Sequence, residues 1–249
     1  MSQQTVAITG ASSGIGAALA EEYAAPGFAL YLCGRDQRRL DRVAENCRNK
    51  GADVHTATFD VTDAAACKSW IDGIPGNLDI LIANAGLSRF HTRAEIESVE
   101  TFTQVANVNL LGYVNVVVPA ATRMKQQKEG RIGLISSLAA LQPLPDSPSY
   151  AATKLGVNGY GEALGYYLYP DGVSVSVICP GFIETPMTED HTNWRPFQMT
   201  ASKAAKKIRN AIHKRKWFYA FPKLLVLNIW LGRVSPWSIR RIAIKVFCQ

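Results

Sequence analysis

Residues 201–249 contain no aspartate or glutamate. They carry 12 lysines and arginines, whereas all 20 acidic residues precede them, so the formal net charge of +7 originates in this tail. The cations alternate with large apolar residues, among them Trp217, Trp230 and Trp237. Because no RNA-binding or DNA-binding signature accompanies them, we expect no nucleic-acid partner.

The cysteines show none of the spacings that are typical of disulfide or metal-binding motifs. The five cysteines are odd in number, widely scattered and free of Cys-X-X-Cys or Cys/His spacing. Such a pattern is typical of reduced thiols in a cytosolic protein, and it predicts no metal site.

The sequence also lacks a signal-peptide pattern and a long apolar run. The start MSQQTVAITG has neither a basic n-region nor an apolar h-region. The longest apolar stretch, 217–231, is interrupted by Pro222 and Lys223 and is shorter than the roughly 20 residues of a spanning helix. We therefore expect a cytoplasmic protein that can touch a membrane without crossing it.

Short apolar runs alternate with longer amphipathic stretches along the chain. TVAIT, FALYLC, VHTATF, LDILIA, RIGLIS and VSVSVI are typical of strands, and each precedes a helix-like segment. This order predicts a doubly wound α/β fold, a mostly parallel sheet with helices on both faces. WFYAF at 217–221, ended by Pro222, adds a seventh strand. Length and composition favour one domain over 1–249, in which about 200–249 is a variable extension.

A glycine-rich segment, TGASSGIG at 9–16, follows the first predicted strand and precedes a helix-like stretch. Gly10 permits a tight turn, Gly14 lets the backbone approach a pyrophosphate, and Gly16 lets helix and sheet pack closely. The free N–H groups of the helix start favour a phosphate. The segment predicts dinucleotide contacts at Gly10, Ser12, Ser13, Gly14, Ile15 and Gly16. A plain strand-to-helix turn is the alternative.

The end of the second strand distinguishes between the two nicotinamide cofactors. An acid there would hold the ribose hydroxyls of NAD, whereas a cation accommodates the extra phosphate of NADP. The sequence has Arg35 at this point, and Asp36 behind it fits the cap of the next helix. We therefore favour NADP(H) over NAD(H).

Polar and small residues at the ends of the later strands complete a known pattern. The sequence places Asp60-Val61, Asn84-Ala85-Gly86, Asn109, Ser137, Tyr150, Lys154, Pro180-Gly181 and Thr185 in order. Together with the glycine loop they resemble the short-chain dehydrogenase/reductase family, from about residue 5 to residue 190. The resemblance implies a Rossmann-type fold, catalysis by Asn109, Ser137, Tyr150 and Lys154, and a homodimer formed by helices around 98–127 and 150–168. The further cofactor contacts it implies are Arg35, Asp60, Val61, Asn84, Ala85, Gly86, Tyr150, Lys154, Pro180, Gly181, Ile183 and Thr185.

Tyr150 and Lys154 lie four residues apart, so on a helix they share one face. A nearby ammonium, reinforced by the positive nicotinamide of an oxidised cofactor, favours the phenolate, and we therefore predict that the pKa of Tyr150 lies below its ordinary value near 10. The hydroxyl of Ser137 could hold the substrate oxygen against Tyr150. The family resemblance also implies that Lys154 contacts the nicotinamide ribose and that Asn109 holds a relay water.

Each of these residues has a simpler interpretation. Tyr150 and Lys154 could be an ordinary surface pair, Ser137 and Asp60 could be caps, and Asn109 could make a polar contact within a helix. Taken together, the pattern predicts NADPH-dependent reduction of a ketone or aldehyde on a hydrophobic substrate, with Tyr150 as general acid/base. The alternative is a non-catalytic NADP-binding sensor or a membrane-associated scaffold.

The tail and the segments expected around the substrate are rich in apolar residues. We expect an apolar rim from Leu138, Leu141, Leu144, Trp194 and Phe197. In the tail, KAAKKIRNAIHKRK predicts an amphipathic helix with Ala204, Ala205, Ile208, Ala211 and Ile212 on one side. Gly232 is expected to separate two short helices, the second with an apolar face over 239–246. Residues 222–249 fit peripheral contact with an anionic membrane, and packing on protein is an equal alternative.

Overall fold

The computed structural model describes residues 3–90, 96–189 and 195–236. Seven parallel strands form one sheet in the order β3-β2-β1-β4-β5-β6-β9, as the sequence predicted. Their bounds are β1 Gln4–Thr9, β2 Phe28–Gly34, β3 Asp53–Thr58, β4 Ile80–Ala83, β5 Gly130–Ile135, β6 Val173–Pro180 and β9 Phe218–Phe221. A separate short pair joins β7, Ile183–Glu184, to β8, Met199–Thr200.

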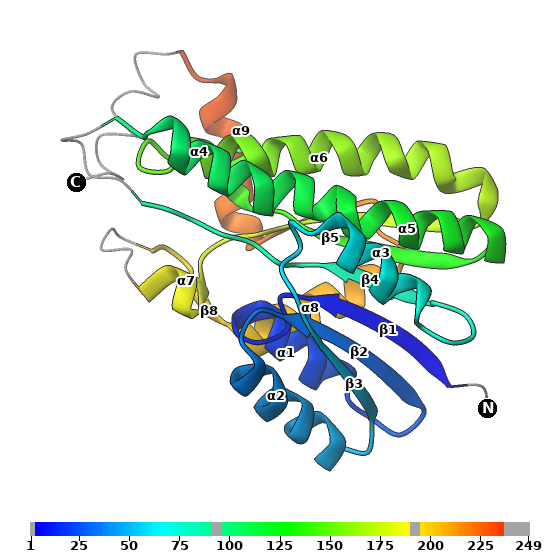
Figure 1. Ribbon diagram of the computed structural model, residues 1–249. Helices are drawn as coiled ribbons and strands as arrows, with labels where there is room; N and C mark the ends of the chain where they lie inside the picture. The colour runs from blue at the N-terminus through cyan, green and yellow to red at the C-terminus, as the bar shows by residue number, and fades with distance from the viewer. Residues whose placement is uncertain (1–2, 91–95, 190–194, 237–249) are drawn as a thin grey trace.

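Helices cover both faces of the sheet (Figure 1). One layer consists of α1 Gly14–Tyr23, α2 Gln37–Asn49 and α8 Ala201–His213. The other consists of α3 Ala64–Asp72, α4 Val99–Ala106, α5 Gly112–Gln127 and α6 Pro148–Leu168, with a π-helical turn at Asn107–Leu111 between α4 and α5. Shorter elements are the 3-10 turns Leu138–Ala140 and Tyr169–Asp171 and helix α7 Pro186–Glu189, and α9 spans Lys223–Val234.

The strands are apolar on both faces because both faces are covered. In β1, Val6 and Ile8 pack toward α1 and α8, whereas Ala7 between them packs toward α3 and α5. A strand buried on both sides reads as a continuous apolar run, as the six predicted strands do. Because all neighbours are parallel, every strand delivers its carboxyl end to the same edge of the sheet.

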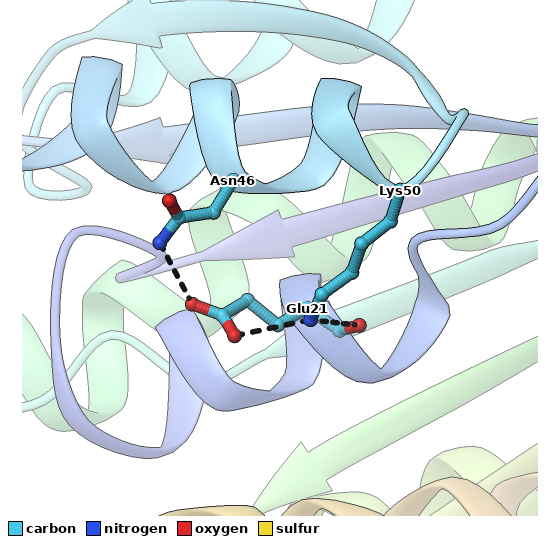
Figure 2. Close-up of polar contacts among 3 residues, drawn as sticks. All are labelled: Glu21, Asn46 and Lys50. Carbon is cyan, nitrogen blue, oxygen red and sulfur yellow. Dashed lines mark hydrogen bonds and ion pairs between the residues drawn. The ribbon is translucent and has the colours of Figure 1, made fainter.

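Polar contacts join α1 to α2 on the outside of their layer (Figure 2). The Glu21 carboxylate accepts hydrogen bonds from Asn46 Nδ2 at 3.2 Å and from Lys50 Nζ at 3.1 Å. Lys50 Nζ also donates to the backbone carbonyl of Glu21 at 3.3 Å. Exposed ion pairs contribute about 0–1 kcal/mol, so the buried side chains between the two helices hold them together.

Part of the basic tail lies in the core of the protein. Helix α8 buries Ala204, Ala205, Ile208, Ala211 and Ile212, the apolar face that the sequence predicted, against α1 and the sheet. Strand β9 confirms the predicted seventh strand and pairs with β6 at the sheet edge.

The first of the two short helices predicted after the sheet is α9, but it runs two residues past the expected break at Gly232 and ends at Val234, directly before Ser235 and Pro236. A side chain at Gly232 would meet nothing within 4 Å, so the glycine serves no close contact. A single helical glycine costs about 1 kcal/mol, which the flanking helix-forming residues outweigh here. The second predicted helix, over 239–246, lies outside the described residues.

One helical stretch, Val99–Gln127, is long and apolar enough to span a membrane by length and composition. The π-helical turn interrupts this stretch, and 44% of its most apolar window is buried against the rest of the protein. Helices of proteins that do not span membranes meet the same criterion, so the stretch by itself is weak evidence for a membrane span.

Two glycines of α6 provide a matched test of this packing. A Cβ at Gly161 would lie 2.5 Å from Val177 Cγ2 and 2.7 Å from Leu134 Cδ1, whereas one at Gly159 would meet nothing within 4 Å. We expect Gly161→Ala to lower the free energy of unfolding by about 1–3 kcal/mol through overpacking. Gly159→Ala should raise it by up to about 1 kcal/mol through helix propensity. Urea unfolding of both variants checks the difference, and equal effects would contradict the packing of α6 on β5 and β6.

Candidate active site

A cavity of about 560 Å³ opens at the carboxyl ends of the central strands. Ligands of open parallel sheets bind at this edge. The predicted residues that line the cavity are Gly10, Ser12, Ser13, Gly14, Ile15, Arg35, Asp60, Val61, Asn84, Ala85, Gly86, Tyr150, Lys154 and Thr185. Most of the residues predicted from the sequence therefore meet around one space.

The glycine loop forms one side of the cavity. Gly10 and Gly14 have φ angles of +65° and +55°, in the region that favours glycine. A Cβ at Gly10 would lie 2.8 Å from Ala85 Cα, and one at Gly14 would lie 3.1 Å from Thr185 Cγ2. Helix α1 starts at Gly14, so its unpaired N–H groups lie at the cavity. The loop fits the pyrophosphate of a dinucleotide.

Hydrogen bonds fix this loop to the end of β4. Thr9 Oγ1 accepts from the backbone N–H groups of Asn84 at 2.9 Å and Ala85 at 3.0 Å. In return, Asn84 Nδ2 donates to the carbonyls of Thr9 at 3.1 Å and Gly10 at 3.3 Å. The sequence prediction included Asn84 and missed Thr9, although a buried threonine next to a phosphate loop is a signal that could have indicated it.

Two cations and two acids border the cavity beyond β2. Arg35 Nη1 lies 3.5 Å from Asp60 Oδ2, and Arg39 Nε lies 3.0 Å from Asp36 Oδ2. Asp36 caps α2 by accepting a hydrogen bond from the Arg39 N–H at 3.0 Å, which confirms the cap predicted from the sequence. Burial favours a higher pKa for Asp60, but hydrogen bonds from Thr62 and the nearby Arg35 outweigh it and lower that pKa. Arg39, one turn along α2, was missed by the sequence prediction.

Tyr150 and Lys154 line the cavity, and Ser137, which is not among the lining residues, hydrogen-bonds to Tyr150. Tyr150 and Lys154 lie on one face of α6, with Lys154 Nζ 5.7 Å from the centre of the Tyr150 ring. The Ser137 side chain hydrogen-bonds to Tyr150, and its Oγ also accepts from the Ala139 N–H at 3.1 Å. Ser137 therefore caps the short helix after β5 and contacts the tyrosine as well.

The pKa values of the pair differ from the sequence prediction. Burial lowers the pKa of Lys154 to about 7, because this side chain is only 3% exposed. Burial also raises the pKa of Tyr150, and the hydrogen bond from Ser137 opposes that rise without cancelling it. In the protein without a cofactor, desolvation therefore opposes the predicted lowering of the Tyr150 pKa by the ammonium.

Asn109 is fully buried in the π-helical turn behind the cavity. Its Oδ1 accepts from the Leu87 N–H at 2.7 Å, and its Nδ2 donates to the Leu87 carbonyl at 2.8 Å and to Thr153 Oγ1 at 3.2 Å. A Cβ at Gly86 would lie 3.5 Å from Asn109 Oδ1 and 3.7 Å from Lys154 Nζ. Asn109 thus joins the chain after β4 to α6, next to the lysine.

Other predicted residues lie behind the cavity wall. Gly181 donates its N–H to the Phe221 carbonyl at 2.8 Å, and Ile183 is buried in the core. Gly16 lies against Gly10, and Pro180 ends β6. The lining residues that the sequence prediction missed, besides Asp36 and Arg39, are Cys33, Gly34, Phe59, Val108, Ile135, Ser136, Pro186 and Met187.

Comparison with known proteins agrees with this geometry. The family described as short chain dehydrogenase matches residues 4–196. The chain belongs to this family, whose members are oxidoreductases that act on CH–OH or C=O groups with NAD(P).

Two curated relatives cover most of the matched segment. A putative ketoacyl reductase of the granaticin polyketide synthase of Streptomyces violaceoruber is 38% identical over 73% of this chain and 68% of its own length. An 11-beta-hydroxysteroid dehydrogenase A of Sesamum indicum is 36% identical over 75% of this chain. The match spans about half of the sesame protein, 54% of its length.

Solved structures share the fold. A variant of the actinorhodin polyketide ketoreductase with NADPH has a TM-score of 0.78 and 25% identity over 88% of this chain and 97% of its own. A short chain dehydrogenase of Mycobacterium paratuberculosis bound to NAD has a TM-score of 0.79 and 24% identity over 88% of this chain and 96% of its own. Both nicotinamide cofactors therefore occur among proteins of this fold.

Proposed function

We propose that this protein is a single-domain, NADPH-dependent reductase of a ketone or aldehyde on a hydrophobic substrate. The observation that carries this proposal is that Tyr150 and Lys154 line the cavity that the glycine loop borders, while Ser137 hydrogen-bonds to Tyr150. A dinucleotide held at that loop extends along the cavity toward Tyr150 and Lys154.

When bound, NADPH supplies the hydride that reduces the carbonyl carbon. The hydroxyls of Ser137 and Tyr150 hold the carbonyl oxygen, and Tyr150 Oη gives its proton to that oxygen as negative charge develops there. Because burial raises the pKa of Tyr150, the phenol keeps its proton at neutral pH, which suits a proton donor. The Lys154 ammonium, behind the ring, favours the phenolate that remains.

The charges beyond β2 support NADP(H). Arg35 and Arg39 border this end of the cavity, where a guanidinium can bind a 2′-phosphate with two hydrogen bonds. Asp36 is engaged as the cap of α2, which leaves it poorly placed to hold ribose hydroxyls. The NADPH complex of the related ketoreductase is consistent with this choice.

An apolar cluster beside Ser137 supports a hydrophobic substrate. Leu138 and Leu141 pack with Ile229 of α9 next to the catalytic serine. Of the other predicted rim residues, Phe197 is exposed, and Trp194 lies outside the described residues. Ketoacyl and hydroxysteroid compounds, which the names of the two relatives mention, are carbonyl or alcohol compounds with large apolar parts.

Exposed apolar side chains on the α4–α6 layer support the homodimer that the family resemblance implies. They are Phe102, Leu111, Val118, Leu155 and Tyr166. A second copy that packs on this layer would remove them from water.

The outer face of α9 supports peripheral contact of a cytosolic enzyme with an anionic membrane. Leu224, Leu227, Trp230, Leu231 and Val234 are 53–80% exposed on this helix. Lys223 and Arg233 flank them, and no acid occurs after residue 200. Each Lys or Arg near an anionic surface adds about 1 kcal/mol of attraction. Since α9 packs on Leu138 and Leu141, such contact would bring the membrane close to the substrate side.

Replacing the phenol tests the chemistry. Tyr150→Phe should bind NADPH normally and lose turnover by about 10²–10⁴-fold, because the proton donor is gone. NADPH oxidation with steroid, retinoid, long-chain acyl and polyol-derived carbonyls measures turnover, and fluorescence titration measures binding. Tyr160→Phe, on the same helix and outside the cavity lining, is the control. A Tyr150→Phe protein as active as the wild type would defeat the mechanism. Wild-type NADPH binding without turnover of any carbonyl would favour the sensor alternative.

Removing the cation at the end of β2 tests the cofactor preference. Arg35→Gln should weaken NADPH binding roughly tenfold or more, since a charge-assisted hydrogen bond to the 2′-phosphate is lost, and leave NADH binding unchanged. Arg38→Gln removes an exposed cation of α2 that does not line the cavity and should change neither affinity. Calorimetric titration with both cofactors measures the difference, and a parallel loss of NADH affinity would argue against a 2′-phosphate site.

Polar substitutions on α9 test membrane contact. The wild type should sediment with vesicles that contain phosphatidylglycerol at low salt, and less so at high salt. The double variant Leu227→Gln, Trp230→Gln should stay in the supernatant. Tyr169→Gln, which replaces an exposed aromatic residue at the end of α6, should sediment like the wild type. A wild-type protein that remains wholly in the supernatant at low salt would rule out the contact.

A further inference from the structure

A second buried tyrosine, Tyr113 of α5, contacts the ammonium of Lys154. Tyr113 is only 2% exposed, and its hydroxyl donates to the Ile135 carbonyl at 2.6 Å. The same oxygen accepts from Lys154 Nζ at 3.1 Å, and Nζ lies 4.8 Å from the centre of the Tyr113 ring. Lys154 Nζ also donates to the Ile135 carbonyl at 2.9 Å, so the three groups form a closed triangle.

This triangle determines how the ammonium is solvated. An ammonium has three N–H donors, and here one faces the Ile135 carbonyl and one faces Tyr113 Oη. The third is left for the cavity, which Lys154 lines together with Tyr150. Across the described residues, no carboxylate forms an ion pair with Lys154, so neutral oxygens and a ring face solvate this buried charge. Besides the two tyrosines, the Cys179 thiol of β6 acts on Lys154, and burial raises the pKa of this thiol to about 11, so it is neutral where Lys154 titrates.

The direction of the hydrogen bonds around Tyr113 is fixed. Its proton points to the Ile135 carbonyl, which leaves a lone pair for Lys154 Nζ. Burial and then the nearby Tyr150 raise the pKa of Tyr113 well above its ordinary value, so this phenol stays neutral. A neutral acceptor stabilises the ammonium without cancelling the positive charge that it presents to Tyr150.

Asn109 and Tyr113, from the π-helical turn and the start of α5, contact two consecutive residues of α6. Asn109 in the π-helical turn bonds to Thr153, and Tyr113 four residues later bonds to Lys154. Between them, Gly112 allows a close approach, since a Cβ there would lie 2.7 Å from Val61 Cγ2 in the cavity wall. The turn and the start of α5 therefore form a rigid support for the lysine.

We propose that Tyr113 is a positioning residue that keeps the Lys154 ammonium charged and directed at Tyr150. The proposal rests on the proposed reductase function and adds a residue to its machinery. Tyr113 touches no substrate in this scheme and acts only through the lysine. A residue with a merely structural role would affect stability and leave the ionisation of Lys154 unchanged.

The variant Tyr113→Phe tests this role, because it keeps the ring and removes the acceptor. With one acceptor fewer, the charged form of Lys154 is disfavoured, and its pKa should fall from about 7 by about one unit or more. A lysine is charged below its pKa, so the loss of activity with rising pH should begin about one unit lower in the variant. Activity should recover at acid pH, where Lys154 regains its proton.

Tyr23→Phe is the matched control. Tyr23 is a fully buried tyrosine in the opposite layer, and its hydroxyl has no hydrogen-bond partner among the described residues. Its removal should leave the pH profile of kcat/KM where the wild type has it. An equal shift in Tyr23→Phe and Tyr113→Phe would overturn the proposal, because it would reflect general loosening of the core.

Direct titration of Lys154 separates this proposal from the proposed function. The NADPH-bound protein labelled with ¹³C at the lysine ε-carbon reports each lysine ionisation by NMR, and Lys154→Met identifies the resonance. The pKa of Lys154 should be lower in Tyr113→Phe than in the wild type and in Tyr23→Phe, whether or not a carbonyl is turned over. An unchanged pKa in Tyr113→Phe overturns the role of Tyr113 even if the enzyme is an active reductase.

Discussion

The burial of one positive charge beneath a phenol is the constraint on which this site depends. Lys154 is held by neutral groups in a region that penalises its charge, and its pKa of about 7 leaves it partly protonated at neutral pH. Desolvation also holds the proton on Tyr150. The protein thus maintains an ammonium and a neutral phenol side by side, an arrangement suited to giving up one proton when negative charge appears nearby.

The parallel sheet makes this arrangement possible. The glycine loop after β1, the asparagine after β4 and the serine after β5 are far apart in the sequence, yet they reach one edge because their strands run in the same direction. Thr9 and Asn84 then fix the relative positions of two of these ends by four hydrogen bonds. The order and direction of the strands therefore determine where the cavity lies, independently of the catalytic side chains.

The sequence predicted the sheet and the buried face of α8 from the periodicity of their apolar residues. It predicted the glycine loop from the position of its glycines between a strand and a helix. It could not predict Tyr113 or Arg39, since their roles arise from contacts across elements. It predicted the wrong direction for the pKa of Tyr150 in the protein without a cofactor. The spacing of Tyr150 and Lys154 shows that the two groups are close, but it does not show how deeply the fold buries them. Gly232 was misjudged because it does not adopt the positive φ by which glycine ends a helix, and it stays within α9.

Strand β9 has a consequence for how this protein can diversify. It closes the sheet by pairing with β6, and α9, which follows directly, packs on the residues next to Ser137. Both come from the part of the chain beyond the family match at 4–196. The segment beyond the family match is therefore part of the scaffold as well, so a change there that alters the substrate side must still let Phe218–Phe221 complete the edge of the sheet.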